Sequence, residues 1–205
     1  MKTRIRSLTA LLSALTASLL VLSHPAQAGY IVTLKQVGSN VVANGGGAIN
    51  LAGLSHSGSA GGSQPYIKAE EGTIVTGPKG VPFDVYSAKA GPHRLGSGAT
   101  VFADTGSGDP VGINSFSDEF LVPQGYVSNN VLSSSATWNN KTFASLGLTP
   151  GTYKWTWGTG ANENFTVIIP GLAWSWSWLP WFIGVVLLGS GLLLLAARRR
   201  KLGLG

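Results

Sequence analysis

The stretch LTPGTYKWTW, residues 148–157, decides the fold class of this chain. A proline–glycine turn opens it, and three aromatic residues, Tyr153, Trp155 and Trp157, then follow with single polar residues between them. A period of two places alternate side chains on one face of a β-strand. We expect this aromatic face to point into a hydrophobic core, because a strand needs an apolar face to bury. The alternative is an exposed platform on which sugar rings stack.

Similar strand-like runs fill the whole interval 29–170, with glycine, proline, serine and asparagine between them and no long helical period. About ten such runs predict an all-β fold, in the form of a single β-sandwich-like domain over residues 29–170. The expected strands are Tyr30–Val37, Asn40–Ala43, Ala48–Leu54, Thr73–Thr76, Phe83–Tyr86, Ala99–Ala103, Glu119–Val122, Val131–Thr137, Thr152–Trp157 and Asn164–Ile169.

Two glycine-rich segments predict local structure. Asn44–Gly47, which reads Asn-Gly-Gly-Gly, can supply the positive φ angles of a hairpin turn or a bulge. Ser55–Gln64 contains three glycines and four serines, and this composition predicts a flexible loop.

The positive charge of the chain lies at its two ends. The formal net charge is +6, but three of the basic residues stand before position 7 and four stand at 198–201. Between residues 29 and 170, seven basic and eight acidic residues leave a net charge of −1. This distribution excludes nucleic acid as an expected partner. The chain has no cysteine, so we expect the domain to be held by its core without disulfides.

The first 28 residues have the three parts of a secretory signal peptide. Basic residues are followed by the apolar stretch Leu8–Leu22, and Ala26-Gln27-Ala28 then provides the small residues that signal peptidase accepts. We predict cleavage here, with Ala26 and Ala28 as the recognised residues. The alternative is an uncleaved anchor helix.

Leu179–Ala197 is a run of 19 uncharged residues, which as a helix approaches the roughly 30 Å thickness of a bilayer core. We predict a transmembrane helix, with the lipid bilayer as its partner. The residues predicted to stop transfer are Arg198, Arg199, Arg200 and Lys201, in a basic cytoplasmic tail of residues 198–205. The residues predicted at the outer membrane interface, in and after a Trp/Ser linker of residues 171–178, are Trp174, Trp176, Trp178 and Trp181. The domain would then lie outside the cytoplasm.

One motif raises the possibility of catalysis. Asp104-Thr105-Gly106-Ser107 follows apolar residues, as in the active-site loop of aspartic proteases, where two aspartates share a proton. A second such motif is absent, so the simpler interpretation is a strand that ends in a turn, with Asp104 bonded to its own backbone. Asp104 and Asp109 could also contribute to a calcium loop, although no EF-hand pattern supports one. We therefore expect a protein that is not an enzyme and has no cofactor; a hydrolase that uses Asp104 is a remote alternative.

Five segments carry a resemblance to a known family: YIVTLKQVG at 30–38, GGGAINL at 45–51, GSGDPVG at 106–112, VPQGYVS at 122–128 and LTPGTYKWTWGTGAN at 148–162. They are similar to the PEP-CTERM, exosortase-associated exported proteins of Gram-negative bacteria. The order of signal peptide, β domain, apolar helix and arginine cluster matches as well. The resemblance implies a cell-surface or matrix role, with a sorting transpeptidase and exopolysaccharide as partners.

One feature departs from this family. Its members carry a Pro-Glu-Pro motif before the helix, whereas this chain reads Ile169-Pro170-Gly171-Leu172-Ala173 there. Two locations therefore stay open: the inner membrane facing the periplasm, or the cell surface after sorting. The leading hypothesis for the function is a non-enzymatic component of the cell envelope or extracellular matrix. The alternative is a carbohydrate- or protein-binding adhesion module.

Overall fold

The computed structural model describes residues 29–87, 91–160 and 162–171. The predicted signal peptide, residues 172–178 of the linker, the predicted transmembrane helix and the basic tail lie outside these residues. Within the described part, no helix has the length and apolar character needed to cross a membrane.

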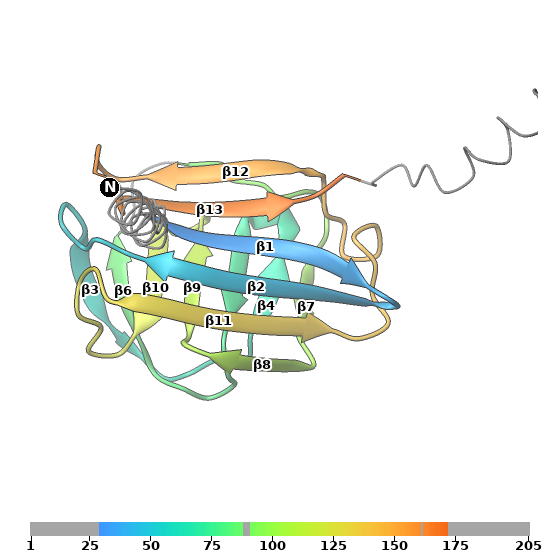
Figure 1. Cartoon of the computed structure of the whole chain (residues 1–205), viewed down its shortest axis with the longest axis horizontal. Coiled ribbons are helices and arrows are strands. Elements are labelled where there is room, and N and C mark those ends of the chain that lie inside the picture. Colours follow the sequence, from blue (N-terminus) through green and yellow to red (C-terminus); the bar gives the residue numbers. More distant parts are fainter. Residues whose placement is uncertain (1–28, 88–90, 161, 172–205) are drawn as a thin grey trace, which may run out of the picture. The chain divides into compact units, whose positions relative to one another are not determined.

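The described residues are all-β and form two sheets, as the sequence predicts (Figure 1). The first sheet has the strand order β12-β13-β1-β2-β11-β8 and the second the order β3-β6-β10-β9-β5-β4-β7. Only the pair β1–β13 is parallel among the pairings of these strands. The bounds are β1 Tyr30–Val37, β2 Asn40–Ala48, β3 Ser55–Ala60, β4 Tyr66–Lys68, β5 Thr73–Thr76, β6 Phe83–Ser87, β7 Thr100–Phe102, β8 Thr105–Gly108, β9 Val111–Asn114, β10 Glu119–Pro123, β11 Val131–Trp138, β12 Gly151–Thr156 and β13 Asn164–Ile169, with a 3-10 turn at Ala69–Glu71.

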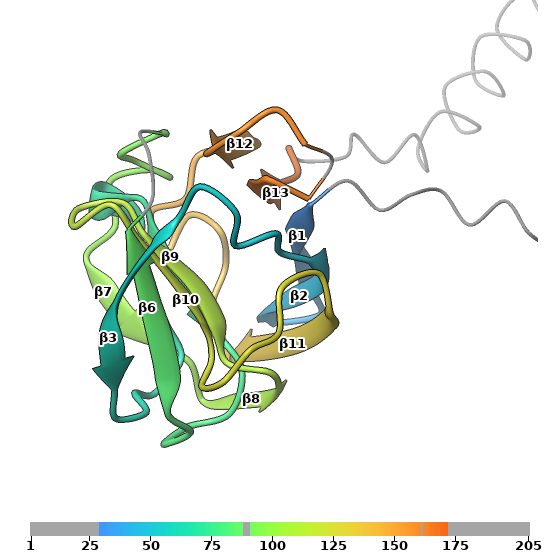
Figure 2. The ribbon, with the colours of Figure 1, turned by 90° about the vertical axis from the view of Figure 1, so that its left-hand side faces the viewer.

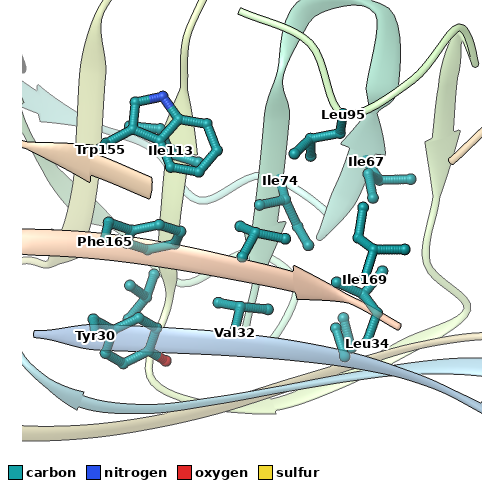
Figure 3. Packing of buried hydrophobic residues seen from close by; sticks show 14 of the residues in the cluster. Tyr30, Val32, Leu34, Ile67, Ile74, Leu95, Ile113, Trp155, Phe165 and Ile169 are labelled. Carbon is teal, nitrogen blue, oxygen red and sulfur yellow. The ribbon is translucent and has the colours of Figure 1, made fainter. Parts of the chain in front are cut away.

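The two sheets pack face to face as separate layers, and their strands cross rather than run alongside one another (Figures 1 and 2). Such crossed packing is one of the two standard arrangements of stacked sheets. Side chains from both sheets meet in one core, in which Trp155 and Phe165 come from the first sheet and Ile74 and Ile113 from the second (Figure 3). Among the described residues, the members of this core run from Tyr30 to Ile169 and come from both sheets.

A second, smaller apolar cluster lies on the other side of the second sheet. Its buried members are Val75, Phe83 and Leu121, and Tyr66 and Val85 pack against them. Neighbours of these residues along the strands, such as Ile74 and Phe120, belong to the main core. Since successive side chains of a strand point to opposite faces, the second cluster marks the outer face of this sheet.

Most of the predicted strands are confirmed, three of them with the same bounds: β1, β5 and β13. The prediction for Ala48–Leu54 is wrong, because β2 ends at Ala48. The backbone of the next residues is bonded to loops instead: Ile49 N donates to Tyr126 Oη at 3.0 Å, and Asn50 N donates to Asn162 O at 2.9 Å. The predicted loop Ser55–Gln64 is also wrong in its first half, which is the edge strand β3, paired with β6 through a bulge.

The glycine run Asn44–Gly47 does not turn the chain, contrary to the prediction, although Gly47 has φ +134°. It continues β2, which pairs with β1 on one side and β11 on the other. Gly45 leaves room for the phenol of Tyr30: a Cβ on Gly45 would lie 2.4 Å from Tyr30 Oη and 2.7 Å from Ser134 Oγ. Gly45 therefore serves the packing of the core within a paired strand.

The space above Gly45 holds a chain of buried hydroxyl groups that joins the two sheets. Tyr30 Oη lies 2.6 Å from Ser134 Oγ, which lies 2.6 Å from Thr76 Oγ1, and Thr76 donates to Val111 O at 3.1 Å. Because a carbonyl can only accept, the proton of each hydroxyl is directed toward Val111, and Tyr30 is the first donor. Burial raises the pKa of Tyr30 far above its usual value of 10, so this donor keeps its proton.

Candidate binding surface

The aromatic strand 152–157 belongs to the core. Trp155 and Trp157 are only 1% and 7% exposed, and Tyr153 is half-buried. The ring of Trp157 meets Phe120 of the second sheet with centroids 4.6 Å apart. The expected core-facing strand is confirmed, and the two tryptophans cannot serve as a sugar-stacking platform.

The strongest candidate for a binding surface is the outer face of the second sheet. The strand register places its side chains in two rows that run across the strands. We call them the apolar row and the polar row. The apolar row comprises Val85, Leu121, Gly112, Val75, Tyr66 and Phe102; the polar row comprises Ser87, Glu119, Asn114, Thr73, Lys68 and Thr100.

The apolar row ends in a pair of aromatic rings at the edge of the sheet. Tyr66 and Phe102 are paired across β4 and β7, and their ring centroids are 5.9 Å apart with planes inclined at 58°. Tyr66 is half-buried and Phe102 is 57% exposed. Paired rings with an accessible face offer apolar area for a flat partner.

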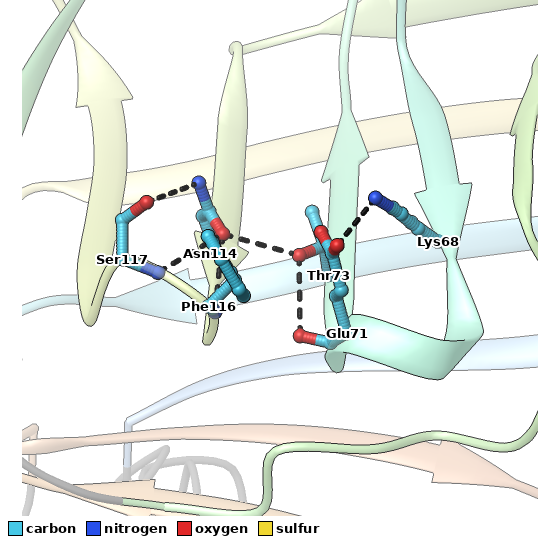
Figure 4. Close-up of polar contacts among 6 residues, drawn as sticks. All are labelled: Lys68, Glu71, Thr73, Asn114, Phe116 and Ser117. Atoms are coloured by element: carbon cyan, nitrogen blue, oxygen red, sulfur yellow. Dashed lines mark hydrogen bonds and ion pairs between the residues drawn. The ribbon is translucent and has the colours of Figure 1, made fainter.

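Two members of the polar row, Thr73 and Asn114, are bonded to each other, and further bonds join members of the row to the neighbouring residues Glu71, Phe116 and Ser117 (Figure 4). Thr73 Oγ1 donates to Asn114 Oδ1 at 3.3 Å, and the same oxygen accepts the backbone N–H of Phe116 at 3.2 Å. Asn114 Nδ2 donates to Ser117 Oγ at 3.3 Å. This bond uses one of the two protons of the amide. These bonds fix the side chain of Asn114 at the tip of the β9–β10 hairpin.

The lysine on this face is paired with a neighbouring carboxylate. Lys68 Nζ donates to Glu71 Oε1, and this hydrogen bond raises the pKa of the Lys68 ammonium. Burial, followed by the negative charge of Glu71, raises the pKa of the Tyr66 phenol, so Tyr66 stays neutral and can donate a proton. The face therefore offers hydroxyl, amide and carboxylate groups beside two rings, with its lysine already neutralised.

The two aspartates of the considered catalytic and calcium sites hold the backbone near strand β11. Asp104 Oδ2 accepts the N–H of Asn139 at 2.7 Å, and Asp109 Oδ2 accepts the N–H of Ser133 at 2.8 Å. The simpler interpretation expected Asp104 to bond its own backbone. Its carboxylate instead accepts a hydrogen bond from the distant backbone segment at Asn139. Within the ranges that the structure describes, no three His, Cys, Asp or Glu side chains are grouped as metal ligands.

A further carboxylate, Asp84, is buried where β3 meets β6. It accepts from Ser59 Oγ at 2.6 Å and from the N–H of Gly125 at 2.8 Å, and His56 Nε2 lies 3.8 Å away. The bond from Ser59, then that from Gly125, lowers the pKa of Asp84. Ser59 is bonded to the carboxylate and not to His56, so the three residues do not form a nucleophile–base pair.

Sequence reasoning did not identify Tyr66 or Phe102. Each stands in a strand of three residues, too short to show a period, and 36 positions separate them. The predicted residues at the ends of the chain, namely Ala26, Ala28, the four tryptophans and Arg198–Lys201, lie outside the described residues. Comparisons with protein-family models, with curated proteins and with solved structures find no match.

Proposed function

We propose that this chain is an exported, membrane-tethered protein of the cell envelope or extracellular matrix, without enzymatic activity, whose outer sheet face binds polysaccharide. Export is supported by the signal-peptide pattern of residues 1–28, and tethering by the apolar run Leu179–Ala197 with Arg198–Lys201 after it. The likeness to exosortase-associated proteins supports export and a role in the cell envelope or matrix.

The binding role rests on one observation, the ring pair of Tyr66 and Phe102 beside the polar row. Sugar rings present C–H groups on their faces and hydroxyls at their edges. An exposed ring such as Phe102 can cover the C–H face of a sugar, while the amide of Asn114 and the carboxylate of Glu119 can bond its hydroxyls. Since Lys68 is paired with Glu71, the face favours an uncharged polymer over an acidic one.

Phe102→Ala tests this function, with Phe116→Ala as a matched control. Phe116 is 75% exposed on the β9–β10 hairpin but stands outside the apolar row. Affinity electrophoresis of the soluble 29–170 domain through gels of neutral and acidic polysaccharides would measure retardation. We expect a neutral polymer to retard the wild type and Phe116→Ala, and retardation to be lost in Phe102→Ala. Equal mobility of all three proteins in every polymer would sink the proposal.

The tether is tested separately. Mass spectrometry of the mature C-terminus distinguishes a lasting anchor, which ends at Gly205, from a chain shortened by a sorting transpeptidase. Because the Pro-Glu-Pro motif is missing, we expect the intact end, with the domain on the periplasmic side of the inner membrane. A shortened chain at the cell surface would place the protein in the matrix.

A further inference from the structure

The first described residue, Gly29, occupies a site that only glycine fits. It is buried and has φ +82°, and a Cβ there would lie 2.3 Å from Asn164 Oδ1 and 2.4 Å from Asn164 O. Its carbonyl oxygen faces Gly47 of β2 so closely that a Cβ on Gly47 would lie 2.2 Å from it. The start of the domain is therefore wedged between β13 and β2.

The backbone nitrogen of Gly29 points at a positioned acceptor. It donates to Asn162 Oδ1 at 3.3 Å. Asn162 Nδ2 donates in turn to Asn129 Oδ1 at 3.0 Å, and Asn162 O accepts from Asn50 N at 2.9 Å. Because the amide nitrogen of Asn162 is directed at Asn129, its oxygen is left for Gly29.

The predicted signal-peptidase site, Ala26-Gln27-Ala28, ends immediately before this residue. Hydrolysis of the Ala28–Gly29 bond by the peptidase adds the hydroxyl of water to the carbonyl carbon of Ala28 and a hydrogen to the nitrogen of Gly29. The new α-amine takes up one more proton from solvent at neutral pH, since its ordinary pKa is about 8.

We infer that processing at this bond delivers the α-ammonium group of Gly29 to Asn162 Oδ1, so that the cleaved N-terminus is a bound part of the domain. The site takes a primary ammonium group that the chain itself supplies. A charged donor makes a stronger hydrogen bond to an amide oxygen than the neutral N–H it replaces. The inference rests on the proposed export, and it names Ala28–Gly29 as the bond that signal peptidase cuts.

The experiment uses the full chain, expressed in a Gram-negative host and purified from its membranes in detergent. Mass spectrometry gives the first residue, and an amine-acylating reagent at neutral pH gives the reactivity of the α-amine. We expect a chain that starts at Gly29, with its amine acylated about tenfold more slowly in the native protein than in urea, as a hydrogen bond to a charged group implies. Lys79 is exposed and serves as the internal reference.

Asn162→Ala should raise the native acylation rate of Gly29 toward the rate in urea. Asn139→Ala changes an exposed asparagine that follows β11, and should leave the rate unchanged. A chain that begins at Met1 and stays in the cytoplasm would refute export and the inference together, whereas an exported chain that begins at Met1, held by an uncleaved anchor helix, would overturn the inference alone. A chain cleaved at another bond, or a Gly29 amine that reacts equally fast in native protein and in urea, would overturn the inference and leave export standing.

Discussion

Alanine at position 45 puts the packing of the two sheets to a quantitative test. The new Cβ would meet Tyr30 Oη at 2.4 Å and Ser134 Oγ at 2.7 Å. Tyr30 is 0% exposed, and its ring stacks on Phe165 with centroids 5.5 Å apart, so it cannot turn toward solvent. Relief of the clash must shift the ring within the core and break its bond to Ser134.

The magnitude follows from three contributions. Forcing one extra carbon into a packed core costs about 1–3 kcal/mol. Separating Tyr30 from Ser134 leaves the buried hydroxyl of Tyr30 without its acceptor and costs about 1–3 kcal/mol more. Alanine in place of glycine in a strand returns about 0.5–1 kcal/mol. We therefore expect Gly45→Ala to lower the free energy of unfolding by about 3 kcal/mol.

Equilibrium unfolding of the 29–170 domain in urea, followed by tryptophan fluorescence, measures this change. Gly61→Ala is the control, because a Cβ there meets no atom within 4 Å and its φ is not in the left-handed region. Tyr30→Phe in the Gly45→Ala background removes the oxygen that collides, and should recover part of the loss. An unchanged midpoint for Gly45→Ala, or no recovery in the double variant, would refute the assignment of the clash to Tyr30 Oη.

Three further predictions concern the same domain. Folding raises the pKa of Tyr30 above its ordinary value of 10. The contribution of Tyr30 to the free energy of unfolding is therefore present below pH 10 and is lost as the pH rises further. Between neutral and alkaline pH, the urea midpoint of Tyr30→Phe should fall less steeply than that of the wild type. Folding lowers the pKa of Asp84 from 3.8, so its contribution to the free energy of unfolding is present above that pH and is lost as the pH falls through the lowered value. In an acid titration, Asp84→Asn should lose stability less steeply than the wild type. A curve parallel to that of the wild type would contradict the bonds from Ser59 and Gly125. Tyr126→Phe removes the bonds of its hydroxyl with Ile49 and Asn130 and should cost about 1–2 kcal/mol in the urea assay; faster proteolysis confined to residues 49–54 would accompany it.

The sequence is sufficient where a strand buries one face and shows the other. β1 has this alternation in its first five residues, β13 carries Phe165, Val167 and Ile169 at alternate positions, and the predicted bounds of both strands coincide with the observed ones. The alternation in β12 is a local property too, because the aromatic residues stand two apart whatever their partners are. A core-facing strand can therefore be recognised before any pairing is known.

Strands that have no apolar face cannot be recognised from the alternation of their side chains. β3 reads Ser-His-Ser-Gly-Ser-Ala and is an edge strand that buries none of its residues, so its composition is that of a loop. The second half of β2 consists of glycines because Tyr30 and Gly29 approach it from β1. In both cases the strand exists because a neighbour distant in sequence supplies its hydrogen bonds, and composition carries no record of that neighbour.

The candidate surface has the same origin. Phe102 becomes a partner of Tyr66 only because β7 pairs with β4, and Thr73 reaches Asn114 only because β5 pairs with β9. Trp155 and Trp157, by contrast, belong to the core, as their alternation with polar residues predicts, because they face the opposite sheet. In a two-layered β protein the conspicuous aromatic strands have a core to fill. Exposed aromatic residues at the ends of short strands are therefore the better guide to a binding face.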